Sequence, residues 1–228
     1  MRAVAVALLD LLFPPACAAC GEPLRSSAEE PFCETCREAV DEVPRGCARC
    51  GLPGPDSPCG ACRADPPAFD EVRAAGLFGG PLADAVHAFK YRDRPALSRP
   101  LGRWLARRVT LPPESALVSV PLARGRRVAR GYDQAALLAR HLSRAAGLPL
   151  LPGALRRLRE TPPQVGRSRA ERARNVAGAF AADGRVRGRA IALVDDVVTT
   201  GATADACARA LRAAGARRVI ALALGRAE

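Results

Sequence analysis

Lysine, aromatic residues and long apolar runs are all scarce in this chain of 228 residues. Lys90 is the only lysine among 35 basic residues, and Phe, Trp and Tyr together make up 4% of the sequence. No run approaches the ~20 apolar residues that a transmembrane helix needs, so we expect no membrane span. The chain also lacks G-x-G-x-x-G and the Gly-Lys-Ser/Thr of a Walker loop, which excludes two widespread nucleotide-binding motifs.

The first 16 residues are mostly apolar and resemble a short signal peptide. Asp10 interrupts the apolar run, however, and Pro14 and Pro15 lie where a cleavage site needs small residues. We therefore predict an amphipathic helix over residues 1–16 that ends at the prolines, and a cytoplasmic protein. Secretion is the alternative.

Charge is distributed unevenly along the chain. Residues 1–65 contain 6 arginines and 10 acidic residues, a net charge of −4, whereas residues 66–228 contain 29 basic and 13 acidic residues, a net charge of +16. A basic part of this size attracts polyanions, and a diphosphate compound and a nucleic acid both qualify. An ordinary soluble protein with a basic isoelectric point is also compatible with this charge.

Eight of the nine cysteines form four C-x-x-C pairs within residues 17–62. Two such pairs can hold one tetrahedral zinc ion, so the segment can bind up to two structural zinc ions. The repeat of C-G-E-P at residue 20 as C-G-L-P at residue 50 favours sequential sites over cross-braced ones. The predicted zinc ligands are Cys17, Cys20, Cys33 and Cys36 in one site, and Cys47, Cys50, Cys59 and Cys62 in the other. A disulfide framework in an oxidising compartment is the alternative.

The stretch AIALVDDVVTTGAT at residues 190–203 predicts a buried strand, a loop and the start of a helix. Asp195 and Asp196 would lie at the carboxyl end of the strand, where they can bind sugar hydroxyls or a hard cation such as Mg²⁺. The loop would present hydroxyl and backbone N–H groups to a phosphate at a helix N-terminus. The predicted phosphate-binding residues are Val197, Val198, Thr199, Thr200, Gly201, Ala202 and Thr203.

The rest of the chain after residue 65 alternates further strands and helices. We predict strands over residues 71–78, 116–121 and 218–224, and helices over residues 82–91, 97–109, 134–146 and 202–214. The chain thus divides into three parts: a helix at 1–16, a Cys-rich module at 17–65 and a larger domain at 66–228.

Two arginine-rich segments interrupt this pattern. The first is a predicted loop after the strand at 116–121, for which we predict an anion site. Its arginines are Arg124, Arg126, Arg127 and Arg130. The second segment, residues 155–176, contains seven arginines and two prolines, so we expect a mobile lid without an ordered strand or core helix over most of its length. Lys90 hints at a need for a compact ammonium group. A solvated basic loop is the alternative for the first segment.

The stretch at 190–203 closely resembles the phosphoribosyl-diphosphate (PRPP) motif of type I phosphoribosyltransferases. In that family the two acids hold the ribose hydroxyls and the loop amides hold the 5′-phosphate. A basic loop corresponding to residues 122–134 faces the diphosphate, and a flexible loop at about the place of residues 155–176 closes over the substrate. The resemblance implies a mostly parallel sheet flanked by helices, and a Mg²⁺–PRPP site.

The combination of C-x-x-C pairs with this motif resembles the ComF family, known for late competence proteins of bacterial DNA uptake and for relatives such as GntX. The leader-like LLFPPxC occurs at residues 11–17, F-K-Y at 89–91 and R-G-Y-D-Q at 130–134, where Asp133 replaces a more usual asparagine. The family's Q…R-x-x-N stretch corresponds to Gln164, Arg172 and Asn175. The resemblance extends over nearly the whole chain.

Two functional hypotheses follow from these resemblances. The first is an enzyme that transfers ribose 5-phosphate from PRPP to a nitrogenous acceptor, with a role in natural competence. The second is a non-catalytic protein that binds PRPP or a nucleotide and acts on single-stranded DNA together with competence proteins. A zinc protein that has lost turnover is a third interpretation. The sequence does not identify an acceptor.

Overall fold

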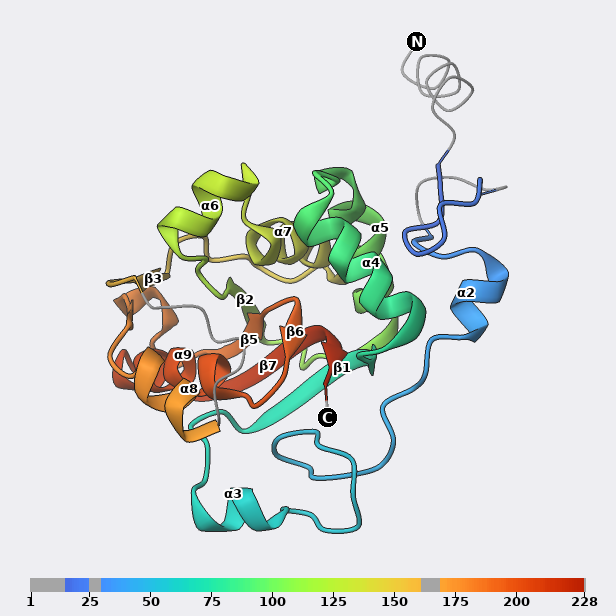
Figure 1. The fold of residues 1–228 in the computed structure, drawn as a ribbon. Helices are drawn as coiled ribbons and strands as arrows, with labels where there is room; N and C mark the ends of the chain where they lie inside the picture. The colour runs from blue at the N-terminus through green and yellow to red at the C-terminus, as the bar shows by residue number, and fades with distance from the viewer. Residues whose placement is uncertain (1–14, 25–29, 161–168, 228) are drawn as a thin grey trace.

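The computed structural model of the protein describes residues 15–24, 30–160 and 169–227 (Figure 1). A Cys-rich N-terminal segment runs along one side and the lower edge of an α/β body. The predicted fold class, a Cys-rich module followed by an α/β domain with a parallel sheet, is confirmed. The predicted helix at 1–16 lies outside the described residues except for its last two positions, and Gln164 lies outside them as well.

The body is built on a parallel sheet with the strand order β1-β7-β5-β2. Its strands are β1 (Glu71–Leu77), β2 (Ser115–Ser119), β5 (Ala190–Val194) and β7 (Arg218–Arg226), and the short β6 (Val197–Val198) pairs with the end of β7. All five side chains of β5 are buried, as expected for a central parallel strand that helices cover on both faces. The carboxyl end of β5 therefore lies between two neighbouring strands.

Helices cover both faces of the sheet (Figure 1). On one face lie α4 (Gly80–Tyr91), α5 (Ser98–Arg108) and α7 (Gln134–Ala146), and on the other lies α9 (Ala202–Ala213). Val194 belongs to the first core and Leu193 to the second, because successive side chains of a strand point to opposite faces. The helices and strands predicted from periodicity are confirmed to within a few residues at each end. Two 3₁₀ turns, η1 (Pro95–Leu97) and η2 (Gly184–Val186), complete the described connections.

The two arginine-rich segments are more ordered than predicted. The loop expected after β2 contains a helix, α6 (Arg124–Arg130), which ends at Gly131 with φ of 75°. Within residues 155–176 the structure contains β3 (Leu155–Arg157) and α8 (Arg169–Val176), and β3 pairs with β4 (Phe180–Ala182). Leu155 and Phe180 are buried in the core beneath α9, so two apolar anchors hold this strand pair against the body.

The two halves of the Cys-rich segment pack on opposite faces of the body. Cys17 and Phe32 join the core of α4 and α5, where the Phe32 and Trp104 ring centroids are 5.4 Å apart. Cys50 and Phe69 join the core of α9 instead. Two short helices, α2 (Glu34–Glu38) and α3 (Gly60–Ala64), begin directly after the first cysteine of the second pair in each half and contain the second cysteine of that pair. Among the described helices, none has the length and apolar character that crossing a lipid bilayer requires.

Candidate functional site

The eight paired cysteines form two separate groups of four thiols, here called the first and the second thiol group. The first consists of Cys17, Cys20, Cys33 and Cys36, the second of Cys47, Cys50, Cys59 and Cys62, and the four Sγ atoms of each lie within 4.8 Å of one another. This is the sequential arrangement predicted from the repeat. A tetrahedral zinc ion with Zn–S bonds of about 2.3 Å holds its sulfurs about 3.8 Å apart. The Sγ atoms of Cys20 and Cys33, and those of Cys50 and Cys59, are 3.8 Å apart, so both groups fit structural zinc.

Backbone N–H groups favour an ionised sulfur in each thiol group. Burial opposes ionisation of the Cys17 thiol, but N–H groups of Cys33 and of the first knuckle outweigh it and lower its pKa to about 7. The pKa of Cys47 falls to about 6 against the same opposition from burial, because the N–H groups of Cys50 and Cys59 lie 3.4 and 3.3 Å from its Sγ. Zinc binds thiolates, and four of them leave no open coordination position. The two groups therefore have a structural rather than a catalytic chemistry.

Asp195 and Asp196 follow β5 directly and lie at the carboxyl end of the sheet. The Asp195 N–H donates to the Leu222 carbonyl at 2.8 Å, and the Asp196 N–H donates to the Asp195 carboxylate at 2.8 Å. Lys90 Nζ lies 2.6 Å from Asp196 Oδ1, and only 19% and 14% of these two side chains are exposed. The lysine singled out in the sequence thus pairs with one of the two predicted acids.

The other acid of the pair, Asp195, lies in surroundings that favour its protonated form. Burial, and then the neighbouring charge of Asp196, raise the pKa of Asp195 to about 7. Lys90 acts in the opposite direction on Asp195, but it does not cancel the other two effects. A cation or sugar hydroxyls placed beside Asp195 would favour its ionised form.

The predicted phosphate loop forms a small hollow between β5 and α9. It is lined by Asp195 and by residues 197–204. Gly201 has φ of 78° and precedes α9, where the first turn of a helix leaves backbone N–H groups without intrahelical partners. A Cβ at Gly201 would lie 3.4 Å from Phe69 Cζ, an ordinary van der Waals contact, so the positive φ and not the space favours glycine here. The hollow has the geometry of an anion site at a helix N-terminus.

A cleft of about 410 Å³, here called the first cleft, adjoins the acid pair and the phosphate loop. Arg126 and Arg130 of α6 line its opposite wall. The Arg130 guanidinium lies 4.7 Å from the ring centroid of Tyr91, and its Nη1 donates to Gln134 Oε1 at 3.2 Å. Gln134 is 1% exposed, and its Nε2 finds no acceptor among the described residues. Sequence prediction missed Gln134 as a site residue, although it ends the R-G-Y-D-Q stretch.

Arg124 and Arg127 do not line this cleft. They line a neighbouring one of about 630 Å³, here called the second cleft, together with Arg156, Arg157 and Arg159. Because α6 is a helix, positions three or four apart share a side, and the four predicted anion-binding arginines divide into two pairs. Arg157 lines both clefts and lies over the Phe180 ring, and burial, then Arg126, lower its pKa. Sequence prediction did not identify Arg157 as a cleft residue, because nothing distinguishes it from the six other arginines of residues 155–176.

The predicted lid residues are only partly placed. Gln164 lies outside the described residues, and Arg172 belongs to α8 without a described side chain. Asn175 is not among the residues lining either cleft; its carbonyl accepts from Arg159 Nη2 at 3.1 Å. The Glu160 carboxylate, at the end of the described part of this segment, accepts the Arg124 N–H at 2.7 Å and fixes the start of α6.

Comparison with known proteins identifies the family of the Cys-rich part. The double zinc ribbon domain family matches residues 8–66. Among solved structures, the glutamine PRPP amidotransferase from B. subtilis in complex with ADP and GMP is 23% identical, with a TM-score of 0.42, and the match covers 60% of this chain and 30% of that one. The protein TT1426 from Thermus thermophilus is also 23% identical, with a TM-score of 0.32 over 55% of this chain and 72% of that one.

Whole-length relatives extend the comparison to the α/β body. The DNA utilization protein YhgH of Salmonella typhi is 35% identical over 218 residues, which are 92% of this chain and 96% of that protein. Competence protein F of Haemophilus influenzae is 32% identical over 214 residues, which are 88% of this chain and 92% of that protein. Because these relatives match nearly its whole length, the chain belongs to the ComF family, together with YhgH and Competence protein F.

Proposed function

We propose that the chain binds Mg²⁺–PRPP in the first cleft and transfers or recognises its phosphoribosyl group. The observation that carries this proposal is the meeting of three groups at the end of β5: two acids, a small hollow at a helix N-terminus and two arginines. A volume of about 410 Å³ lies in the range of small-molecule sites, about 300–1,000 Å³.

Each group has a distinct part in the proposed complex. The residue 197–203 loop holds the 5′-phosphate through N–H and hydroxyl groups, and Asp195 and Asp196 hold the ribose hydroxyls. Arg126 and Arg130 face the diphosphate. In a transfer reaction the bond from C1′ to the diphosphate oxygen breaks while a bond from C1′ to an acceptor nitrogen forms, and the arginines stabilise the charge on the leaving diphosphate.

The chain's residues also fit the cation that this ligand carries. The donor set at the end of β5 is carboxylate oxygen with threonine hydroxyls nearby, which is the chemistry that Mg²⁺ prefers. Bound Mg²⁺ would offset the negative charge of the diphosphate. Lys90 limits the number of free carboxylate oxygens by holding Asp196 Oδ1, so Asp195 is the better placed acid for a cation or its water ligands.

Replacing both acids should abolish PRPP binding. We expect Asp195→Asn/Asp196→Asn to weaken Mg²⁺–PRPP binding by at least 100-fold, because two hydrogen-bonded charged contacts of about 1.5–3 kcal/mol each are lost. Isothermal titration calorimetry on the zinc-loaded protein measures this. A double variant of carboxylates outside both clefts, Asp84→Asn/Asp183→Asn, should bind like the wild type. Absence of binding by the wild type would reject the proposal, and binding would justify screening acceptors for diphosphate release.

The second cleft favours a further candidate function, binding of single-stranded DNA. Five arginines line it together with Leu158, whose side chain is 65% accessible, and the exposed Val128 of α6 follows the lining residue Arg127 in the sequence. A groove of arginines can bind the phosphates of a single strand, and exposed apolar side chains beside it can contact the bases. The names of the two relatives, a DNA utilization protein and a competence protein, agree with such a ligand and with competence proteins as partners.

Loss of charge in the second cleft should weaken DNA binding in a salt-dependent way. We expect Arg124→Gln/Arg127→Gln/Arg156→Gln to lower the slope of log K against log salt by about 2, since each phosphate contact to a single strand contributes about 0.7. Fluorescence anisotropy with an oligothymidine over a range of salt measures the slope. Arg99→Gln/Arg103→Gln/Arg144→Gln, on a basic patch of α5 and α7, removes the same charge elsewhere. An equal effect of both triple variants would show general charge attraction rather than a site.

A further inference from the structure

A buried arginine joins the second thiol group to the phosphate loop. Arg226, at the end of β7, is 3% exposed. Its Nε donates to the Cys50 carbonyl at 2.8 Å, and its Nη1 donates to the Thr199 carbonyl at 2.6 Å and the Val198 carbonyl at 3.2 Å. Cys50 is a ligand position of the second thiol group, and Thr199 belongs to the phosphate loop. One guanidinium therefore fixes the backbone of both.

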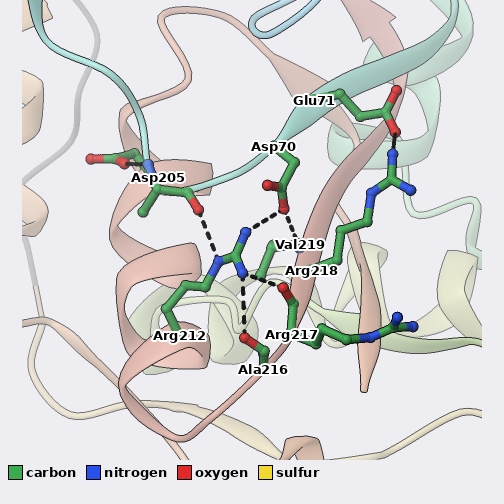
Figure 2. Close-up of polar contacts among 9 residues, drawn as sticks. Asp70, Glu71, Asp205, Arg212, Ala216, Arg217, Arg218 and Val219 are labelled. Atoms are coloured by element: carbon green, nitrogen blue, oxygen red, sulfur yellow. Dashed lines mark hydrogen bonds and ion pairs between the residues drawn. The ribbon is translucent and has the colours of Figure 1, made fainter. Parts of the chain in front are cut away.

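Residues 68–70, here called the linker, follow the second thiol group and contact the phosphate loop and α9. Phe69 is buried and packs within 3.4 Å of the Cβ position of Gly201. The Ala68 N–H donates to the Asp205 carboxylate of α9 at 2.6 Å. Figure 2 shows Arg212 of α9 between Asp70 and the backbone at Ala216 and Arg217, with Asp70 Oδ2 2.5 Å from its Nη2. The linker and α9 thus form one clamped unit.

We infer that Arg226 is a positioning residue through which the second thiol group supports the phosphate loop. The planar guanidinium is suited to this, because its donors reach several carbonyl oxygens at fixed directions and a lysine cannot do so. Four zinc-bound thiolates carry about two negative charges, which favour a buried cation beside them. Loss of zinc from this group frees the Cys50 backbone that Arg226 holds, so the loop should loosen with it.

The first thiol group provides an internal control. Cys17 and Phe32 pack against α4 and α5 on the other face of the sheet, as does Cys33 in part. By the repeat, Cys33 is the counterpart of Cys59: each opens the second C-x-x-C pair of its half. Loss of zinc from the first thiol group should therefore leave the phosphate loop unchanged.

The test is amide hydrogen exchange, read by mass spectrometry on peptides that cover residues 195–206, without any ligand. We expect Arg226→Lys, which keeps the charge and loses the fork, to raise exchange in these peptides about tenfold. Arg218→Lys, at the opposite end of β7 where Arg218 pairs with Glu71 at 2.7 Å, should leave them unchanged. The same readout should rise in Cys59→Ser and stay at the wild-type level in Cys33→Ser, while zinc analysis shows one ion lost from each.

Unchanged loop exchange in folded Arg226→Lys would overturn the inference, and so would an equal rise in Cys33→Ser and Cys59→Ser. If Cys59→Ser fails to fold, the comparison of Arg226→Lys with Arg218→Lys decides alone. The effect on ligand rests on the proposed function: Mg²⁺–PRPP should bind Arg226→Lys about tenfold more weakly than wild type. Because exchange is measured without ligand, a wild type that binds no PRPP rejects the proposed function and leaves this inference to be judged by the loop.

Discussion

Removal of zinc is expected to unfold most of residues 17–65 while the parallel sheet stays folded. The ribbon has little apolar core of its own: α2 contains no buried residue, and in α3 only Cys62 is buried. Structural zinc supplies about 10–16 kcal/mol in small zinc-binding peptides, which is comparable to the whole stability of a typical domain, about 5–15 kcal/mol. The sheet strands β5 and β7, in contrast, are buried between two cores that consist mainly of side chains from the body.

Limited trypsin digestion after chelation at pH 8 measures this effect. New cleavage should be confined to the ribbon, where Arg37, Arg45, Arg49 and Arg63 provide sites. A parallel sample treated with chelator and then excess zinc should regain protection. Continued protection of these four sites in zinc-free protein would contradict the prediction, and digestion of the sheet at the same rate would show that the body depends on the ribbon.

Periodicity and spacing predicted much of this architecture because they are local. The run at 190–194 is apolar at every position, as is typical of a parallel strand covered on both faces, and β5 is fully buried. The repeat of the C-x-x-C pairs predicted which cysteines group together, since short knuckles bring nearby thiols to one point. Asp133 caps α7 by accepting the Ala136 N–H at 3.0 Å, a local contact that its place just before the predicted helix at 134–146 favours.

The features that sequence could not reveal depend on distant parts of the chain. The sequence does not show that the segment after β2 is a helix, so it does not show which of its arginines lie on the same side. In α6, Arg126 lines the first cleft and Arg124 lines the second. The contact of Arg226 with Cys50 joins residues 176 positions apart. Nothing near Arg226 in the sequence distinguishes it from the many other arginines, and only the pairing of β7 with β6 brings it to the loop.

The acid pair is expected to cost stability at neutral pH. The pKa of Asp195 rises from an ordinary 3.8 to about 7, through burial first and the charge of Asp196 second. Between pH 3.8 and about 7, Asp195 keeps a proton in the folded protein that it releases in the unfolded chain. The contribution of Asp195 to the free energy of unfolding is therefore complete below about pH 4 and is lost as the pH rises to about 7. Asp195→Asn should remove this cost, because an amide oxygen can still accept the Asp196 N–H.

The gain should be about 1–3 kcal/mol at pH 8, less than the roughly 4 kcal/mol of a full three-unit shift, since Asp195 is only half-buried. Urea unfolding in magnesium-free buffer measures it, and at pH 5.5 the gain should fall to about half, because the linkage is then incomplete. Asp196→Asn should act in the opposite direction, since it leaves the largely buried Lys90 ammonium without its carboxylate partner at 2.6 Å. If Asp195→Asn proved less stable than wild type at pH 8, the site would be an ordinary hydrogen-bonded turn. If the fold holds two like charges together in order to bind a ligand, a variant that removes one of them should gain stability and lose ligand binding.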